Sequence, residues 1–328
     1  MNDSSGHGNK EANTRILITG GAGFIAYHLA ARLQEGQHDI ALLDNFNNFY
    51  DPALKRRNVR DLQERGPIRI LETDILDVAR LRKAFEETRP QAIVHLAAWA
   101  GILPSLEQPA LYAEVNVTGT VNLLQLAREF SVESFIFGSS SSVYGGSARV
   151  PFSEDDPVDR PVSPYAATKR AGELLCHTYA CNYGMHITCL RFFTVYGPRQ
   201  RPEMAIHKFA RLITEGKEIP VFGDGESRRD YTYVDDIISG VAAALEVNPP
   251  FEIINLGEAR TTTLLELICH LEGALGKKAM RHFLPDQPGD MRTTYANIDR
   301  ARRILRYQPS TPIEEGIRKF VSWFLQQP

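Results

Sequence analysis

The sequence is short of several features that would place it in particular classes of protein. Its four cysteines, Cys176, Cys181, Cys189 and Cys269, form no CxxC pair and do not have the spacing of metal ligands. We therefore expect reduced structural thiols and no metal site. No apolar run approaches the length of a membrane span, and the polar start MNDSSGHGNKEANTR lacks the apolar stretch of a signal peptide. These absences favour a cytoplasmic protein without a membrane partner.

An excess of charge of one sign is also missing. The chain has 37 Lys and Arg residues against 40 Asp and Glu residues, which gives a net charge of −3. Nucleic acids and anionic membranes are bound mainly through excess positive charge, so neither is an expected partner. Hydrophobic residues make up 43% of the chain, enough for a core. At 328 residues the chain exceeds the usual size of one domain, which predicts a large domain with a smaller one attached.

Short apolar runs alternate with helical patterns in the first half of the chain. The runs are RILITG, DIALLD, IRILETD, AIVHLAA, SFIFGS and HITCLRFF. Continuous apolar runs of this length are typical of strands buried on both faces of a parallel sheet. Between the runs lie helical spacings such as that of Ile25, Leu29 and Leu33. The alternation predicts an α/β fold with a Rossmann-type, doubly wound parallel sheet.

Proline and glycine interrupt this pattern from about residue 197, in YGPRQRP, VFGDGE and LPDQPGD. Two capping boxes, Thr263–Glu266 and Thr311–Glu314, still indicate helix starts there. We predict a disordered tail over 1–13, a dinucleotide-binding domain with the catalytic residues over 14–196, and a smaller α/β lobe over 197–328. The smaller lobe mainly binds the substrate in this interpretation, and the chain crosses between the lobes.

The first strand leads into a glycine-rich turn, RILITGGAGFIA. The turn contains Gly20, Gly23 and, where a dinucleotide fingerprint has its third glycine, Ala26. Such a turn lets backbone N–H groups and a helix N-terminus meet a pyrophosphate. The third position serves helix–strand packing, where alanine is the smallest possible change. A tight strand–helix turn without any ligand is the alternative.

The ends of the next strands supply further candidates. Asp44 ends the second strand at a distance that suits hydrogen bonds to a ribose diol, and no arginine follows it directly, which favours NAD over NADP. Asp74 ends the third strand and is predicted to meet the adenine. A helix cap for Asp44 and a plain turn for Asp74 are the alternatives. His95-Leu-Ala-Ala98 ends the fourth strand in small residues, as close approach of a cofactor requires. The predicted cofactor-binding residues are Gly20, Gly23, Phe24, Ile25, Asp44, Asn45, Asp74, Ile75, Leu96, Ala97, Ala98, Tyr165 and Lys169.

Candidate catalytic residues are predicted further along the chain, in SPYAATKRAGE. Ser163 can cap a helix that has Pro164 at its first position, which places Tyr165 and Lys169 one turn apart on one face. A tyrosine normally loses its proton near pH 10, but a neighbouring ammonium and the positive nicotinamide of bound NAD⁺ favour its phenolate. The pair would then act as a base near neutral pH. An ordinary exposed Tyr/Lys pair is the alternative.

Together, TGGAGFIA, SSSSVYG, YAATK and RFFTVYGPRQRP resemble the extended short-chain dehydrogenase/reductase family of nucleotide-sugar epimerases and dehydratases. DNFNNFYDP, PFSEDDPVD and RFFTVYGPRQRP are most similar to bacterial UDP-glucuronate 4-epimerases. The resemblance covers the chain from about residue 14 to its end. It implies a catalytic Ser140–Tyr165–Lys169 triad, a bound NAD, a UDP-sugar substrate and a homodimer that pairs helices near residues 109–130 and 164–184.

The resemblance also gives the serine run a meaning. Dehydratases and decarboxylases of the family carry an Asp-Glu pair or a Glu just before VYG, where this chain has Ser141 and Ser142. Hydroxyls can hold a substrate but cannot replace a carboxylate acid or base. The site is therefore expected to oxidise a sugar carbon and reduce it again, as a 4-epimerase does.

The resemblance further implies a set of substrate-binding residues. They are Ser141, Ser142, Thr194, Arg201, Arg229 and Arg292. Two arginines, Arg229 and Arg292, suit the two phosphates, and Arg201 is expected to bind a uronate carboxylate. Leu103 departs from the pattern, because many uronate epimerases carry arginine there. UDP-glucose/galactose or a UDP-N-acetylhexosamine pair thus remain alternative substrates, and a non-catalytic NAD-sensing protein is the alternative in another class.

Overall fold

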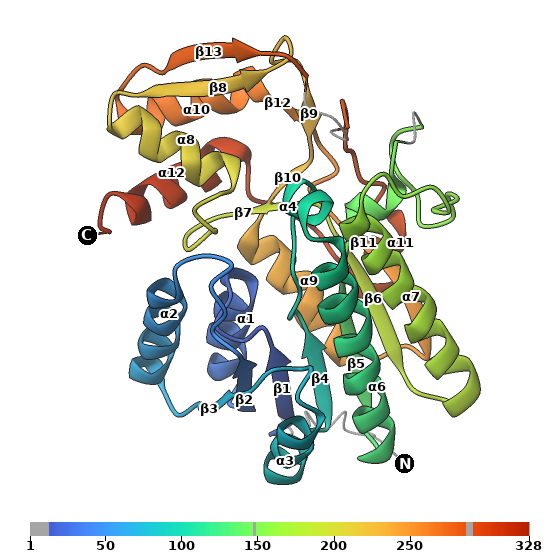
Figure 1. Cartoon of the computed structure of the whole chain (residues 1–328). Helices are drawn as coiled ribbons and strands as arrows, with labels where there is room; N and C mark the ends of the chain where they lie inside the picture. The colour runs from blue at the N-terminus through green and yellow to red at the C-terminus, as the bar shows by residue number, and fades with distance from the viewer. Residues whose placement is uncertain (1–12, 147–148, 287–290, 328) are drawn as a thin grey trace, which may run out of the picture.

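A seven-stranded, wholly parallel sheet forms the larger lobe of the protein, seen in the computed structural model of Figure 1. The structure describes residues 13–146, 149–286 and 291–327, so the predicted tail over 1–13 lies almost entirely outside the described residues. The strand order is β11-β6-β5-β4-β1-β2-β3. The strands are β1 (Arg15–Thr19), β2 (Asp39–Asp44), β3 (Arg69–Glu72), β4 (Ala92–His95), β5 (Ser134–Ser140), β6 (Ile187–Phe192) and β11 (Phe251–Leu256). The predicted fold class is confirmed.

Helices cover both faces of this sheet. The helices α1 (Phe24–Glu35), α2 (Pro52–Arg65) and α9 (Val234–Val247) pack with one another on one side. The other side carries α3 (Val78–Thr88), α6 (Gly119–Glu129) and α7 (Pro164–Tyr183). Strands β1, β4 and β5 are almost completely buried because helices shield both of their faces. Strand β11 and helix α9 return from the C-terminal half of the chain to join this lobe.

The smaller lobe lies above the carboxyl ends of the strands (Figure 1). Its helices are α8 (Ala205–Thr214), α10 (Leu264–Leu275) and α12 (Ile313–Phe324), which pack beside a parallel pair of strands, β8 (Glu218–Phe222) and β13 (Met280–Leu284). Short pairs connect the lobes: β7 (Thr194–Tyr196) with β10 (Tyr231–Tyr233), and β9 (Arg228–Arg229) with β12 (Thr262–Thr263). A single apolar cluster runs from β1 and α1 into α8, α10 and α12.

Shorter segments join these elements. They are α4 (Ile102–Glu107), α5 (Pro109–Ala113), the π-helical η1 (Glu114–Thr118), the 3₁₀ turn η2 (Ser141–Tyr144) and α11 (Asp299–Leu305). In the part of the chain that the structure describes, no helix is both long and apolar enough to cross a bilayer.

Two of the three predicted helix starts are confirmed. Ser163 caps α7 by accepting a hydrogen bond from the Ala166 N–H at 3.2 Å, and Thr263 and Glu266 form a complete capping box at α10. The capping box at Thr311 is wrong. Helix α12 begins at Ile313 after Pro312, without a side-chain cap. The reason is that Asp236 accepts the Thr311 N–H at 3.1 Å, which ties this residue to α9 instead.

Candidate active site

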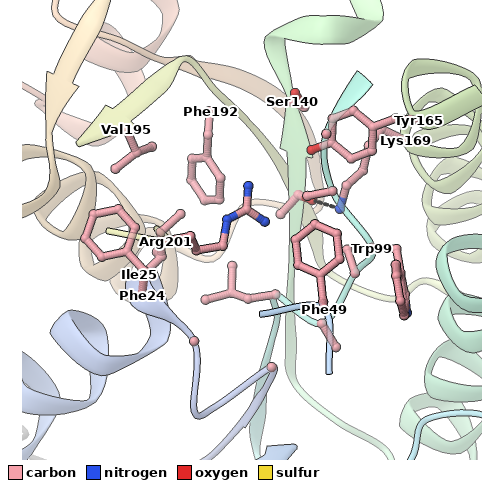
Figure 2. A pocket seen from close by; sticks show the side chains of 18 of the residues that line it. Phe24, Ile25, Phe49, Trp99, Ser140, Tyr165, Lys169, Phe192, Val195 and Arg201 are labelled. Atoms are coloured by element: carbon pink, nitrogen blue, oxygen red, sulfur yellow. Dashed lines mark hydrogen bonds between the residues drawn. The ribbon is translucent and has the colours of Figure 1, made fainter. Parts of the chain in front are cut away.

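A cavity of about 740 Å³ opens at the carboxyl ends of the parallel strands, between the two lobes. Residues that follow β1, β2, β3 and β4 line it, together with the ends of β5 and β6 and segments of the smaller lobe. Ligand sites of doubly wound sheets lie at this edge, and the volume is in the usual range for ligand pockets. Figure 2 shows Tyr165, Lys169 and Ser140 on one side of the cavity and Phe24 and Ile25 on the other.

The glycine turn forms the floor of the cavity where a pyrophosphate would bind. Gly20 has φ +66°, and a Cβ at this position would lie 2.7 Å from the Ala97 backbone nitrogen, so only glycine fits. Gly23 is the N-cap residue of α1 and supplies no side-chain acceptor for the free N–H groups of the first turn. Since Gly23, Phe24 and Ile25 also line the cavity, this uncapped helix end suits an anionic group. The residues present therefore fit a dinucleotide.

Two carboxylates follow the glycine turn along the same edge. Asp44 is buried and accepts hydrogen bonds from the Ala22 N–H at 3.1 Å and the Phe46 N–H at 2.8 Å. It does not cap a helix, because Asp51 caps α2. Asp74 accepts a hydrogen bond from the Asn45 amide at 2.7 Å. Asp44, Asn45, Asp74 and Ile75 all line the cavity, as do Leu96, Ala97 and Ala98.

The end of β4 is held by a buried histidine. His95 Nδ1 lies 2.8 Å from Thr19 Oγ1, and its Nε2 lies 3.0 Å from Thr120 Oγ1. Thr120 Oγ1 also donates to the Asn116 carbonyl, so it accepts from Nε2–H, and Thr19 donates to Nδ1. Burial, aided by the charge of Lys169, lowers the pKa of His95 to about 3. A neutral His95 thus connects β4 to β1 and α6 directly beneath the cavity.

The predicted triad comes together at the end of β5. Ser140 ends β5, and Tyr165 and Lys169 lie on the first turns of α7, with all three in the cavity wall. Ser140 lies near enough to Tyr165 to act on the pKa of its hydroxyl. The Lys169 ammonium donates to the Gly138 carbonyl at 2.7 Å, drawn as a dashed line in Figure 2. The sequence spacing thus places the two helix residues beside the serine that it indicated.

Burial has the largest effect on the pKa values of Tyr165 and Lys169 in this wall. Burial raises the pKa of Tyr165, and the neighbouring Ser140 hydroxyl and the charge of Arg201 oppose that rise. Burial also lowers the pKa of Lys169 to about 8, against the influence of Cys176 and Glu173. That the Lys169 ammonium and a bound nicotinamide favour the phenolate remains a prediction for the loaded enzyme.

The predicted substrate residues line the same cavity, with one exception. Ser141, Ser142, Thr194, Arg201 and Arg229 line it. The Ser142 hydroxyl oxygen is buried and has no hydrogen-bond partner among the described residues. Arg292 is not among the lining residues, because it is exposed and paired with Asp224 at 2.7 Å. Its role at the diphosphate stays a prediction.

Several lining residues escaped the sequence analysis. Lys55 is buried beside the cavity and donates to the Asn47 carbonyl at 2.9 Å and to its side-chain oxygen at 2.8 Å. Phe49 and Trp99 pack edge to face with ring centres 5.1 Å apart, and both line the cavity. Lys55 and Phe49 lie in or just after the stretch DNFNNFYDP, which gave the only hint. No group of three or more His, Cys, Asp or Glu side chains within the described segments is placed to hold a metal ion.

A second group of missed residues holds helix α7 in place. Glu173 is one turn after Lys169 and binds Arg191 of β6 through two contacts of 2.8 Å, with both side chains almost fully buried. Glu173 also accepts from Ser139 at 2.6 Å and from Arg170 at 3.0 Å. Because these contacts reach both β5 and β6, they fix the position of the triad against the sheet.

The cavity combines a wall that fits a dinucleotide, at the carboxyl ends of the first strands, with a Ser–Tyr–Lys triad. These two features define a nicotinamide-dependent enzyme of the short-chain dehydrogenase/reductase type. The family model described as "NAD dependent epimerase/dehydratase family" matches residues 16–257. The chain belongs to this family.

Individual relatives agree over nearly the whole chain. A UDP-glucuronate 4-epimerase of Thermodesulfobacterium geofontis is 42% identical, with 94% of this chain and 95% of the relative covered. The crystal structure of a UDP-glucuronic acid 4-epimerase from Bacillus cereus, with UDP-glucuronic acid and NAD, matches with a TM-score of 0.89 and 36% identity over 95% of this chain and 99% of that one. A UDP-glucose 4-epimerase from Thermotoga maritima, with UDP-glucose, matches with a TM-score of 0.86 and 32% identity over 95% and 98%.

Proposed function

We propose that the protein is an NAD-dependent 4-epimerase of a UDP-sugar, which interconverts UDP-glucuronate and UDP-galacturonate. The observation that carries the proposal is the meeting of Ser140, Tyr165 and Lys169 in one cavity wall, next to Ser141 and Ser142. The similarity to the Thermodesulfobacterium and Bacillus enzymes supports the choice of reaction and substrate.

The chemistry begins with a proton at the sugar 4-hydroxyl. Tyr165 removes this proton as the general base, and Ser140, which lines the same wall, steadies the same sugar oxygen. Bound NAD would supply the acceptor of the hydride from C4 and then its donor. Lys169 holds the ribose side of the cofactor and keeps Tyr165 acidic. After the 4-keto sugar has turned in the cavity, Tyr165 returns the proton to the new 4-hydroxyl. The cycle consumes no net reductant.

The cofactor residues divide by the part of NAD that they would hold. Gly20, Gly23 and the first turn of α1 would hold the pyrophosphate, and Asp44 would bind the adenosine ribose. Asp74 and Ile75 would contact the adenine, and Leu96, Ala97 and Ala98 would line the rest of the cofactor site. Asp44 and the absence of a directly following arginine favour NAD over NADP.

The uronate is favoured by the charge at the sugar end. A carboxylate that enters a closed cavity needs several hydrogen bonds and preferably a cation to offset its lost hydration. Arg201 offers the cation, and Ser141 and Ser142 offer hydroxyl donors. Leu103 supports a second candidate, UDP-glucose and UDP-galactose, because this apolar side chain lines the cavity where many uronate epimerases carry arginine. The similarity to the Thermotoga UDP-glucose 4-epimerase agrees with this candidate.

A panel of UDP-sugars tests the proposal. The protein is incubated separately with UDP-glucuronate, UDP-galacturonate, UDP-glucose, UDP-galactose and UDP-N-acetylglucosamine, and the products are separated by epimer. We expect the highest kcat/KM with the two uronates. A wild-type preference for UDP-glucose would defeat the uronate assignment and would make Leu103 the decisive residue. Binding without turnover of any sugar would instead support an NAD-sensing protein.

The proposal includes a cytoplasmic homodimer. Helix α7 carries the exposed apolar side chains Leu174 and Tyr183, which a partner copy would cover. All four cysteines are free thiols, as suits a reducing compartment. Sedimentation of the purified protein tests the dimer.

A further inference from the structure

Arg201 already has a carboxylate partner in the cavity wall. Its Nε lies 2.9 Å from Oε1 of Glu203, two residues further along the loop between β7 and α8. Both residues line the cavity, with 23% of the Arg201 side chain and 44% of the Glu203 side chain exposed. The positive charge of Arg201, which we expect to bind the uronate carboxylate, is therefore partly offset by Glu203 in the absence of substrate.

Glu203 also acts on the direction in which Arg201 points. Two more neighbours hold the guanidinium: Nη2 lies 3.5 Å from the Met204 sulfur, and the group lies 5.3 Å from the centre of the Phe49 ring. Because Glu203 engages the Nε edge, the terminal amino groups extend into the cavity. Figure 2 shows the guanidinium between Phe192 and Phe49, directed toward the side of Tyr165. This is the end that can meet a carboxylate with two parallel hydrogen bonds.

The two effects of Glu203 on an anionic sugar oppose each other. The contact with Nε presents the fork of Arg201 in a fixed orientation, which lowers the ordering cost of binding. The negative charge of Glu203, however, repels a second carboxylate that shares the same guanidinium. A neutral hexose is not repelled and leaves the ion pair intact. The balance between the orientation of Arg201 and the repulsion by Glu203 should therefore set the preference between a uronate and a neutral hexose.

We propose that Glu203 is a positioning and specificity-determining residue, which orients Arg201 and limits the preference of the cavity for a uronate over a neutral hexose. The inference rests on the proposed function, because it takes Arg201 to face the sugar carboxylate. In this inference the negative charge of Glu203 weakens the binding of a uronate, whereas its contact with the Arg201 Nε strengthens that binding.

Binding measurements on Glu203→Gln test the charge. The Tyr165→Phe variant, loaded with NAD, serves as background, because it should bind UDP-sugars without converting them. Calorimetry then gives the affinities for UDP-glucuronate, UDP-glucose and UDP. Glutamine keeps an acceptor for Nε but removes the charge, so UDP-glucuronate should bind about two- to fivefold tighter, the range of a partly screened ion pair. The affinity for UDP should stay unchanged, and that for UDP-glucose should stay unchanged or fall.

Glu203→Ala tests the orientation. Alanine removes both the charge and the acceptor, so its UDP-glucuronate affinity should lie below that of Glu203→Gln. Equal affinities of the two variants would remove the positioning role. Glu215→Gln is the matched control, since Glu215 lies in the same lobe, pairs with Lys217 at 2.8 Å and does not line the cavity. It should change none of the three affinities.

Two results would overturn the inference: an equal change for all three ligands, or no gain for UDP-glucuronate in Glu203→Gln. Arg201→Met, measured alone and together with Glu203→Gln in the same background, separates a failure of the Glu203 inference from a failure of the proposed function. Arg201→Met should weaken UDP-glucuronate far more than UDP-glucose and should abolish the effect of Glu203→Gln. If it does so while Glu203→Gln alone has no effect, the uronate assignment stands and the Glu203 inference fails. If Arg201→Met weakens both sugars equally, the role of Arg201 itself is wrong.

Discussion

Burial moves the pKa values of Tyr165 and Lys169 in opposite directions, and both shifts disfavour the charged form of the side chain. A phenolate in this wall therefore needs support from its surroundings. Ser140 and the charge of Arg201 give part of it, because both act to lower the pKa of Tyr165. If Arg201 also binds the sugar carboxylate, as we propose, it acts at the residue scale on both the substrate and the base.

Tyr165→Phe tests the base directly. The change removes the hydroxyl with little change in volume, so turnover of UDP-glucuronate should fall by about 10²–10⁴-fold, the usual contribution of a general base. The affinity for UDP-glucuronate should remain close to that of the wild type. Steady-state kinetics and calorimetry measure the two quantities. Activity within a fewfold of wild type would remove Tyr165 from the mechanism.

The serine run predicts which products are absent. Ser141 and Ser142 supply no carboxylate for proton transfer at C5 or C6, so neither dehydration nor decarboxylation should accompany epimerisation. Mass spectrometry of a long incubation with UDP-glucuronate and with UDP-glucose should show only products of unchanged mass. A 4-keto-6-deoxy sugar or a UDP-pentose as a major product would contradict this interpretation of Ser141 and Ser142.

At the scale of elements, His95 connects three parts of the larger lobe: its own strand β4, Thr19 of β1 and Thr120 of α6. Only the neutral ring satisfies both threonines in the arrangement found. Since the pKa of His95 is lowered to about 3, while an unfolded histidine titrates near 6.5, the unfolded chain binds more protons at this site between these pH values. The stabilising effect of His95 is therefore present above about pH 6.5 and is lost as the pH falls toward 3.

His95→Asn should reveal this dependence. At pH 7 the variant should be less stable than the wild type, because it loses hydrogen bonds of a buried group. The difference in unfolding free energy should narrow as the pH is lowered from 7 to 4, since asparagine takes up no proton on unfolding. Denaturant titrations at several pH values measure the difference. His177→Asn, a change at an exposed histidine of α7, is the control for the substitution itself. A constant difference would mean that His95 does not titrate as described.

Elements with a strong local signal could be predicted from the sequence. The apolar runs gave the strands β1 to β6, and the cap at Ser163 gave the start of α7, because these features depend on residues close in the chain. The start of α12 could not be predicted, since Asp236 lies far from Thr311 in sequence. The same holds in the site: the spacing of Tyr165 and Lys169 is local, whereas the contact of Arg201 with Phe49 joins two loops that are far apart in the chain. The contact of Lys55 with Asn47 depends on the path of the turn between β2 and α2.

At the scale of the whole molecule, the cavity is closed by segments from both lobes. The edge that we assign to the cofactor comes from the first strands of the sheet, and the side that we assign to the sugar comes from β7, β9 and the loop that holds Arg201. A shared apolar cluster joins the two lobes. A cofactor and a sugar in this cavity would therefore contact both lobes.

We expect the purified protein to carry NAD and to epimerise its substrate without added cofactor. The cofactor would be restored in each cycle of the proposed reaction, and we expect the uncapped turn at Gly23 together with Asp44 to hold it at the edge of the sheet. Extraction and chromatography give the amount of NAD per chain, and turnover is measured in buffer that contains no nicotinamide. NAD added to stripped protein should raise the melting temperature, by mass action on the folded state, whereas NADP should raise it less. The Asp44→Ala variant should lose most of the bound NAD. Strict dependence on a stoichiometric external hydride donor would instead identify a reductase, because an epimerase has no net use for reducing equivalents.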